Sequence, residues 1–341
     1  MSLNKRLFTG GALPGATLED AFQTVLYTGN RPSNVTVNTF GFSPDLVAIK
    51  DRDNADHWSV LDSTRGQNLI GFNQTGAQED FSGGFEWTSG GFIVKNTGQA
   101  NTNGANLVAW GWYANGGSTS SNTSGSITST VQANDNAGFS IVKYPGTGSN
   151  ATVGHGLSAA PNLVILKNLD STTSWLVQHS EIGPTKALYL ETTNAPTDNA
   201  GFWNDTAPTA TTVSIGTHSD GNANGDDIIA YCWRNVAGFS QFGSYTGNGS
   251  TTGPTITLGF APGLLIFRKV QGDRWIMADN KRDTSNPNDK FLDAQDTHAE
   301  STLGLTGGVD FLSNGFQLKT TDGGGNADGQ EYIYMAWREA P

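Results

Sequence analysis

The residues best suited to bind a metal ion lie in one polar loop. Asp220, Asn222 and Asn224 alternate as in the first half of an EF-hand loop, where side-chain oxygens ligate calcium. The twelfth position of such a loop should be a bidentate Glu, but here it is Tyr231. The flanking segments also have the pattern of strands rather than helices. We therefore interpret this loop as a polar hairpin turn, with a calcium site of another kind as the alternative, and predict no cofactor.

Motifs of the common hydrolases do not occur. The five histidines show no His-Glu-x-x-His spacing, and the chain has no Gly-x-Ser-x-Gly motif. The single cysteine, Cys232, alternates with apolar neighbours, which predicts a small buried side chain rather than a nucleophile. A glycosidase carboxylate pair leaves no sequence signature, because any two acidic residues can meet in space. We predict a protein that is not an enzyme, with a carbohydrate-active protein as the alternative.

Tryptophan is the residue type that most favours glycan binding, because its flat ring can stack on a sugar. The sequence has nine tryptophans, and two of them, Trp87 and Trp203, lie outside a pattern that six others share. These two are the candidates for an exposed sugar-stacking surface, with core or domain-contact roles as the alternative. Six others recur at equivalent positions and are predicted to pack in the core. They are Trp58, Trp175, Trp275, Trp112, Trp233 and Trp337.

A charged pair accompanies two of these tryptophans. The pattern Trp58-x3-Asp62-x2-Arg65 recurs as Trp275-x3-Asp279-x2-Arg282. A catalytic carboxylate would not need an adjacent arginine in two copies. The spacing instead predicts a local ion pair that braces the end of a strand.

Elements that position these residues recur three times, about 100 residues apart. Each unit has a Tyr-x-Gly turn and a proline before an apolar strand. A tryptophan follows seven or eight residues after the end of that strand, and a closing strand ends the unit. In each unit an Asn-Gly or Asp-Gly dipeptide, which favours a tight hairpin turn, precedes a tryptophan by eight residues. The three closing segments are 103–112, 224–233 and 328–337.

Alternation along the closing segments predicts which side chains share a face. One face carries the bulky side chains, such as Val108, Trp110 and Trp112, and we expect it to point into the core of a sandwich. The other face ends on a small residue at Gly111, Cys232 and Ala336, which predicts close packing over that position. Since both faces are apolar, the closing strand should lie in the middle of its sheet.

The number of short segments between Gly, Asn and Pro turns is typical of an all-β chain. We predict three tandem antiparallel β-sandwich repeats, of jelly-roll or lectin-like type, each of about 100 residues. The predicted boundaries are an N-terminal arm at 1–23, repeat 1 at 24–113, a linker at 114–124, repeat 2 at 125–236 and repeat 3 at 237–341.

Composition excludes several classes of partner. The formal net charge is −12, whereas a protein that binds nucleic acid or an anionic membrane surface presents basic residues. No apolar run is long enough to cross a membrane as a helix. We therefore expect neither nucleic-acid binding nor membrane insertion.

Several segments of repeats 2 and 3 resemble a module of tailed-bacteriophage structural proteins, including tail-fibre-like virion proteins of aquatic phages such as cyanophages. The resemblance covers about residues 24–341, and its first repeat departs most, at Tyr27 to Asn30 and at Trp110. The segments are GSITSTVQAN (125–134), AGFSIVKY (137–144), GHGL (154–157), WNDTAP (203–208), FGSYTGNG (242–249), DNKR (279–282), FLSNGF (311–316) and YIYMA (332–336).

This resemblance implies a component of the virion, made in the host cytoplasm, with no catalytic residues. We expect a tail-associated fibre or adhesin-like protein whose arm docks on other virion proteins and whose sandwiches contact the host surface, with a host glycan as one ligand. A homo-oligomer is expected, and a trimer is one form it could take. The alternatives are a capsid decoration protein and, from another class, a carbohydrate-binding or carbohydrate-active protein.

Overall fold

The computed structural model describes residues 21–301 and 307–340. The chain is built mainly of short strands, and the ladders of its main sheets are antiparallel, which confirms the predicted all-β class. Its α-helices in this part of the chain have one turn each, and none could span a membrane. Most of the predicted arm lies outside the described residues, and its last two residues already belong to a strand that begins at Phe22.

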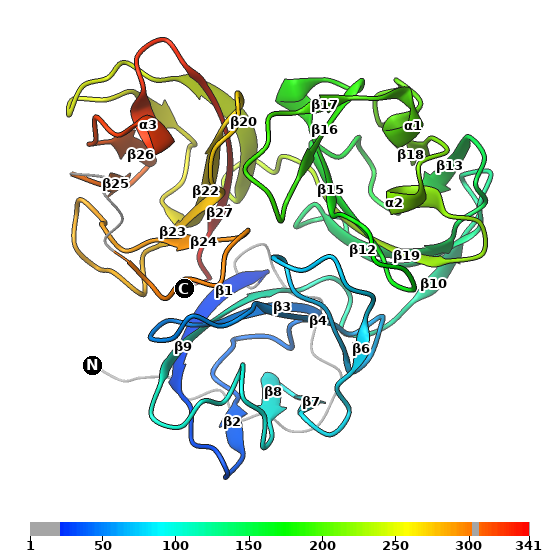
Figure 1. Cartoon of the computed structure of the whole chain (residues 1–341), viewed down its shortest axis with the longest axis horizontal. Helices are drawn as coiled ribbons and strands as arrows, with labels where there is room; N and C mark the ends of the chain where they lie inside the picture. The colour runs from blue at the N-terminus through cyan, green and yellow to red at the C-terminus, as the bar shows by residue number, and fades with distance from the viewer. Residues whose placement is uncertain (1–20, 302–306, 341) are drawn as a thin grey trace.

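The strands form three lobes around a common centre (Figure 1). Lobe 1 comprises residues 21–114. Its main sheet has the order β1-β9-β3-β4, and a second sheet has the order β2-β8-β7. The strands are β1 (Phe22–Thr28), β2 (Val35–Val37), β3 (Leu46–Asp51), β4 (Ser59–Asp62), β5 (Asn68–Leu69), β6 (Glu79–Asp80), β7 (Phe85–Thr88), β8 (Gly91–Val94) and β9 (Asn106–Trp112).

Lobe 2 comprises residues 120–236. Its main sheet contains the order β12-β19-β14-β15, extended by β10-β11 on one edge and β16-β17 on the other, and β13 pairs with β18. The strands are β10 (Ser120–Asn122), β11 (Ser129–Asn134), β12 (Phe139–Pro145), β13 (Ala151–Gly154), β14 (Leu163–Asn168), β15 (Leu176–His179), β16 (Lys186–Tyr189), β17 (Thr197–Asp198), β18 (Thr212–Ile215) and β19 (Asp227–Trp233). The helices are η2 (Ser180–Ile182), α1 (Ala200–Trp203) and α2 (Ser219–Asn222).

Lobe 3 comprises residues 239–340. Its main sheet has the order β20-β27-β22-β23-β24, and its second sheet has the order β21-β26-β25. In lobes 1 and 3 the last long strand therefore lies between the first strand and the strand that starts at or just after the recurring proline, and in lobe 2 β19 lies in the same way between β12 and β14. The elements are β20 (Ser240–Thr246), β21 (Thr255–Thr257), β22 (Pro262–Lys269), β23 (Ile276–Asp279), β24 (Leu292–Asp293), β25 (Val309–Leu312), β26 (Gly315–Leu318), α3 (Gly323–Asn326) and β27 (Glu331–Arg338).

The predicted linker is more ordered than its composition indicates. Its residues Ser120–Asn122 form β10, which pairs with β11. Its first residues wrap around the buried carboxylate of Asp45, which accepts hydrogen bonds from the backbone N–H groups of 114–117 at 2.6–2.8 Å. A short acidic side chain thus fixes a glycine-rich segment that sequence pattern alone marks as flexible.

From the alternation we expected the bulky faces of the closing strands to point into the core of each sandwich. They do not. Val108, Trp110 and Trp112 instead join one large cluster at the centre of the molecule, to which all three lobes contribute. Each lobe has its own core on the opposite face of the same strand, with Leu107 and Ala109 in lobe 1. The alternation identified the two faces correctly, but it could not indicate that the second apolar face meets neighbouring lobes.

Small residues on the lobe-core face do allow close packing. A Cβ atom added at Gly111 would lie 2.5 Å from the Phe40 ring, so the glycine makes room for that ring. Cys232, at the corresponding place in lobe 2, is 1% exposed, and burial raises the pKa of its thiol to about 12. The predicted role of Cys232 as a small buried side chain is confirmed.

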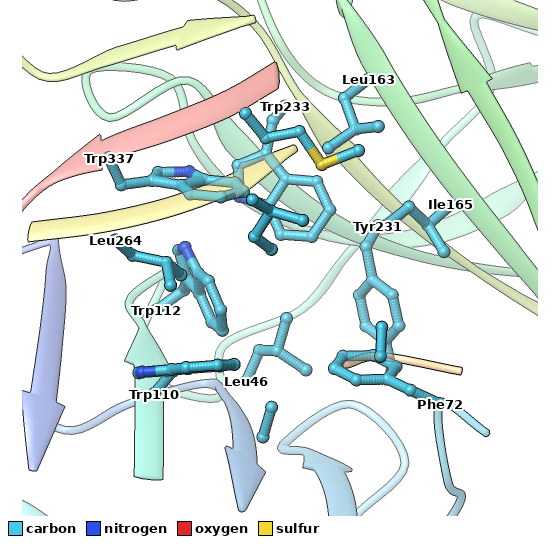
Figure 2. Close-up of a cluster of buried hydrophobic side chains, with 14 of the residues drawn as sticks. Leu46, Phe72, Trp110, Trp112, Leu163, Ile165, Tyr231, Trp233, Leu264 and Trp337 are labelled. Carbon is cyan, nitrogen blue, oxygen red and sulfur yellow. The ribbon is translucent and has the colours of Figure 1, made fainter. Parts of the chain in front are cut away.

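Three tryptophans from the ends of the closing strands meet at the centre (Figure 2). The ring centroids of Trp112, Trp233 and Trp337 lie 5.6–6.0 Å apart, and each pair packs edge to face. This geometry places the positive edge of one ring against the negative face of another. A phenylalanine of the strand next to each closing strand, in β1, β12 and β20, packs on each tryptophan, namely Phe22, Phe139 and Phe242.

The other recurring tryptophans join each lobe to its neighbour. The indole N–H of Trp58 in lobe 1 donates to the carbonyl of Asp293 in lobe 3 at 3.0 Å. Trp275 in lobe 3 donates to Tyr189 in lobe 2 at 3.0 Å, and Trp175 in lobe 2 donates to Gly71 in lobe 1 at 3.0 Å. These bonds form a closed circuit, so the six recurring tryptophans hold the ring together.

The same three joints carry buried polar groups. The ion pairs Asp62–Arg65 and Asp279–Arg282 form as predicted, with side chains 0–1% exposed, but they are more than local. Asp62 accepts a 2.7 Å hydrogen bond from the hydroxyl of Tyr231 in lobe 2, and Asp279 accepts a 3.1 Å bond from the indole of Trp110 in lobe 1.

His179 occupies the corresponding place in lobe 2, where its Nε2 lies 3.2 Å from the carbonyl of Tyr334 in lobe 3. Burial lowers its pKa to about 4, which keeps the imidazole neutral. A neutral ring has one N–H to donate to that carbonyl, and its Nδ1 accepts the N–H of Glu181 at 3.3 Å. His179 is therefore a structural hydrogen-bonding group at the third joint.

Candidate functional site

A cleft of about 350 Å³ lies at one end of lobe 3. Three segments that are distant in the sequence form it: the start of β22, the chain that follows β23, and the turn between β25 and β26. Its volume is at the small end of the range for ligand pockets, about 300–1,000 Å³. The lining residues are Ala261, Pro262, Asn280, Asp283, Thr284, Ser285, Asn286, Phe311, Leu312 and Ser313.

Lobe 2 has a smaller cleft, of about 200 Å³, in the corresponding place. It also includes the proline that recurs in the three lobes, here Pro161, and continues along the end of β15 and the chain that follows it. No aromatic side chain other than His179 lines it, and Ala207 and Pro208 stand where the hairpin turn lies in lobe 3.

In lobe 1 the predicted sugar-stacking residue Trp87 lies at this same place. Trp87 pairs with Phe92 in the β7–β8 hairpin as Phe311 pairs with Phe316 in the β25–β26 hairpin. Its indole N–H donates to the carbonyl of Gly66 at 2.7 Å, and Gly66 follows Arg65 as Asp283 follows Arg282. The half-buried indole of Trp87 thus bridges two segments of lobe 1, and these segments correspond to the two that flank the cleft in lobe 3.

Polar groups in the lobe 3 cleft differ in how far the protein satisfies them. Asp283 accepts hydrogen bonds from the N–H groups of Ser285 at 2.9 Å and Asp289 at 2.8 Å. Burial opposes ionisation of Asp283, but these hydrogen bonds prevail and lower its pKa. By contrast, the buried Oδ1 of Asn280 has no hydrogen-bond partner among the described residues.

Asp283 is the one carboxylate among the residues that line this cleft. A glycosidase needs two carboxyl groups across the scissile bond, one of them protonated to act as the acid. A single carboxylate with a lowered pKa can accept a hydrogen bond but cannot supply that acid. The lining therefore offers hydrogen-bonding groups and one aromatic ring.

Trp203, the second predicted sugar-stacking residue, is not exposed. Its side chain is 0% exposed in the core of lobe 2, and its indole N–H donates to the carbonyl of Lys186 at 3.1 Å. The one-turn helix α1 carries it inward beside Phe202. The prediction of a sugar-stacking surface at Trp203 is therefore wrong, and the alternative core role is the observed one.

The predicted calcium ligands do not converge on one point. Asn222 is 1% exposed, and its amide is used within the protein: Oδ1 accepts the N–H of Thr147 at 2.7 Å, and Nδ2 donates to Ser149 and Gly216. Asp220 lies beside His218 at 3.5 Å, and Asn224 is exposed in the following turn. No group of three or more His, Cys, Asp or Glu side chains suited to a metal ion occurs within residues 21–301 and 307–340.

Asn101 and Asn326 have the same task as Asn222 in the other lobes. Asn101 accepts the N–H of Asn30 at 2.7 Å, and Asn326 accepts that of Asn248 at 2.8 Å. In each lobe the buried amide thereby fixes the loop that follows the Tyr-x-Gly turn, which explains why the sequence resembles a metal loop without being one.

Calcium should accordingly leave stability unchanged. We expect the melting temperature of the protein to be the same in millimolar CaCl₂ and in EDTA, because the oxygen that would ligate the ion already accepts a hydrogen bond. Asn222→Ala should lower the free energy of unfolding by about 1–3 kcal/mol in both buffers, since it leaves buried N–H and C=O groups unpaired. Differential scanning calorimetry measures both, and a calcium-dependent rise in melting temperature would contradict this interpretation.

Glu339 lies where the two ends of the ring meet. The backbone N–H of Ala340 donates to the carbonyl of Phe22 at 2.8 Å, and the N–H of Thr24 donates to Oε1 of Glu339 at 2.9 Å. Burial raises the pKa of Glu339 to about 7, although the Thr24 N–H and the charge of Lys281, 3.9 Å away, favour the ionised form. We call this contact between lobes 1 and 3 the seam.

The stability of the seam should depend on pH. A carboxyl whose pKa is raised in the folded state contributes stability below its unfolded pKa, about 4.5, and loses it as the pH rises towards 7. Glu339→Gln should thus be more stable than the wild type at pH 8, by about 1–3 kcal/mol, since one pKa unit is worth about 1.4 kcal/mol. Urea unfolding at pH 4.5 and pH 8 measures this, and an equal difference at both pH values would contradict it.

Sequence reasoning missed Asn280, Phe311 and Glu339. Phe311 had a signal: it precedes Gly315 by four residues, as Trp87 precedes Gly91, so aligning the two hairpins would have found it. Asn280 and Glu339 had none, because the side chains around them come from distant segments.

A family model described as "Domain of unknown function (DUF7483)" matches residues 18–341. No curated protein matches the chain.

Proposed function

Given that the chain belongs to the DUF7483 family, we propose that it is a structural protein of a tailed-bacteriophage virion, tail-associated and adhesin-like. In this proposal the three lobes are three tandem β-sandwich repeats of one module, which accounts for their common strand order. The resemblance of repeats 2 and 3 to virion modules supports the assignment.

The observation that carries the proposal is the closed ring. Three lobes joined through one aromatic centre form one body, in which lobes 2 and 3 present clefts at corresponding places. The buried polar side chains at the joints, such as Asp62 and His179, are used in holding lobes together. A body of this kind suits presentation and contact better than turnover.

The seam suggests how the ring is attached. Phe22 and Ala340 are hydrogen bonded there, so the first and last described residues of the ring lie together at this point. We propose that the N-terminal segment, residues 1–20, is the arm that docks on other virion proteins. Association of chains into a homo-oligomer, with a trimer as one form, also belongs to the proposal.

Immunogold labelling of purified phage particles tests the location. Label at the tail end would support the proposed role. Label over the head would favour the second candidate, a decoration protein, because a body with three similar lobes suits a threefold position of a shell. Unlabelled particles, with an antibody proven on the purified protein, would contradict both.

A further inference from the structure

We propose that the cleft of lobe 3 binds a neutral glycan, with one pyranose ring stacked on Phe311. This inference rests on the proposed adhesin role and names the ligand class of that role. The cleft is large enough for a sugar residue and draws its lining from three segments of the lobe.

Phe311 supplies the apolar surface. Its half-buried ring packs against the core of lobe 3 and also lines the cleft. The C–H face of a pyranose is apolar, so it can cover an aromatic ring that is held in place. Asn286 holds this one: its Oδ1 accepts the N–H of Phe311 at 2.7 Å, and its Nδ2 donates to the Phe311 carbonyl at 3.2 Å.

Around that ring the cleft presents groups that suit hydroxyls. Thr284, Ser285 and Ser313 line it with hydroxyl groups. The Ser285 hydroxyl donates to Asp283 and can still accept a hydrogen bond from a ligand. The Asn280 amide lines it too, and its oxygen has no partner in the described part of the protein. An unpaired buried amide oxygen is costly, so a ligand that allows the amide to turn and pair gains affinity.

Charge favours a neutral ligand over an acidic one. Asp283 is the only charged residue that lines the cleft, and the whole chain carries a net charge of −12. A sialylated or phosphorylated sugar would bring a second negative charge next to the Asp283 carboxylate without an arginine or lysine in the lining to pair with it.

Comparison of the lobes places the site in lobe 3. The lobe 2 cleft has Pro208 near the place of Phe311 and is smaller. In lobe 1 the side chain of Trp87 is hydrogen bonded across the corresponding place. Lobe 3 combines an available aromatic ring with the larger volume.

The test uses the purified full chain on an array of neutral and acidic glycans, followed by titration calorimetry with the strongest neutral hit. Ser313→Trp should fill the cleft and reduce affinity at least tenfold. Ser89→Trp is the matched control, because Ser89 is also exposed and lies in the corresponding hairpin turn of lobe 1, and it should leave affinity unchanged.

Two further variants separate stacking from folding. Phe311→Ala should also lower affinity at least tenfold, whereas Phe311→Tyr should retain it, because a tyrosine keeps the ring face. An array that shows no neutral glycan bound, or acidic glycans bound more tightly, would overturn the inference, as would affinity unaffected by Ser313→Trp. These results do not depend on where the protein lies on the particle, so immunogold label at the tail with a silent array would refute only the glycan site.

Discussion

Replacing Trp233 with alanine is expected to destabilise all three lobes together, by about 3–5 kcal/mol. This is the usual cost of removing a fully packed aromatic side chain, because the loss of buried surface is combined with a cavity. Trp233 packs on Trp112, Trp337 and Phe139 at centroid distances of 4.8–6.0 Å, so its loss removes contacts to both neighbouring lobes as well as its own.

Urea unfolding followed by tryptophan fluorescence and by circular dichroism measures the effect. Since the lobes share the central cluster, we expect both probes to report a single transition that shifts to lower urea. Trp87→Ala is the control: its side chain is half-buried at a lobe end, outside the central cluster, and we expect a smaller loss. A variant in which lobe 2 unfolds while lobes 1 and 3 remain folded would contradict a shared core.

Removal of the Asp62 carboxylate is expected to cost about 3–5 kcal/mol. In Asp62→Ala the guanidinium of Arg65, 1% exposed, would remain buried without its counter-ion, and the Tyr231 hydroxyl of lobe 2 would lose its acceptor. A surface pair provides the control. Lys95 and Glu86 are 3.1 Å apart with side chains 30% and 48% exposed, so Glu86→Ala should cost less than about 1 kcal/mol.

A double variant identifies the cause of that loss. In Asp62→Ala/Arg65→Met no unpaired charge remains, so much of the stability should return. Chemical denaturation of the single and double variants gives the two free energies of unfolding. If the double variant is no more stable than Asp62→Ala, the loss comes from packing or from Tyr231, and the buried charge is not its cause.

The sequence predicted which residues form the strands better than it predicted which residues those strands contact. The spacing from the Asn-Gly or Asp-Gly turn to the tryptophan located the closing strands, since a hairpin turn and an alternating strand are local patterns. Alternation also sorted Leu107 from Val108 correctly. It could not indicate that Val108 belongs to a cluster shared by all three lobes, because a pattern of period two is the same whichever apolar surface covers it.

The candidate site was predictable only at one point. Trp87 marked the lobe end where the clefts lie, although its own side chain is hydrogen bonded across the place. Asn222 misled, because an amide that fixes a loop and an amide that ligates calcium occur in the same polar sequence. The cleft of lobe 3 joins residues near 262, 283 and 311, and no local pattern relates three such distant segments.

The ring has a consequence for how the protein can evolve. In a trimer of identical subunits, every mutation appears three times, and a change that suits one position is imposed on all. Here a single gene encodes the three positions separately, so selection can act on one without altering the others. Trp87, Pro208 and Phe311 already differ at corresponding places. One lobe can therefore change the surface at its end while the aromatic centre, to which all three contribute, keeps the other two in place.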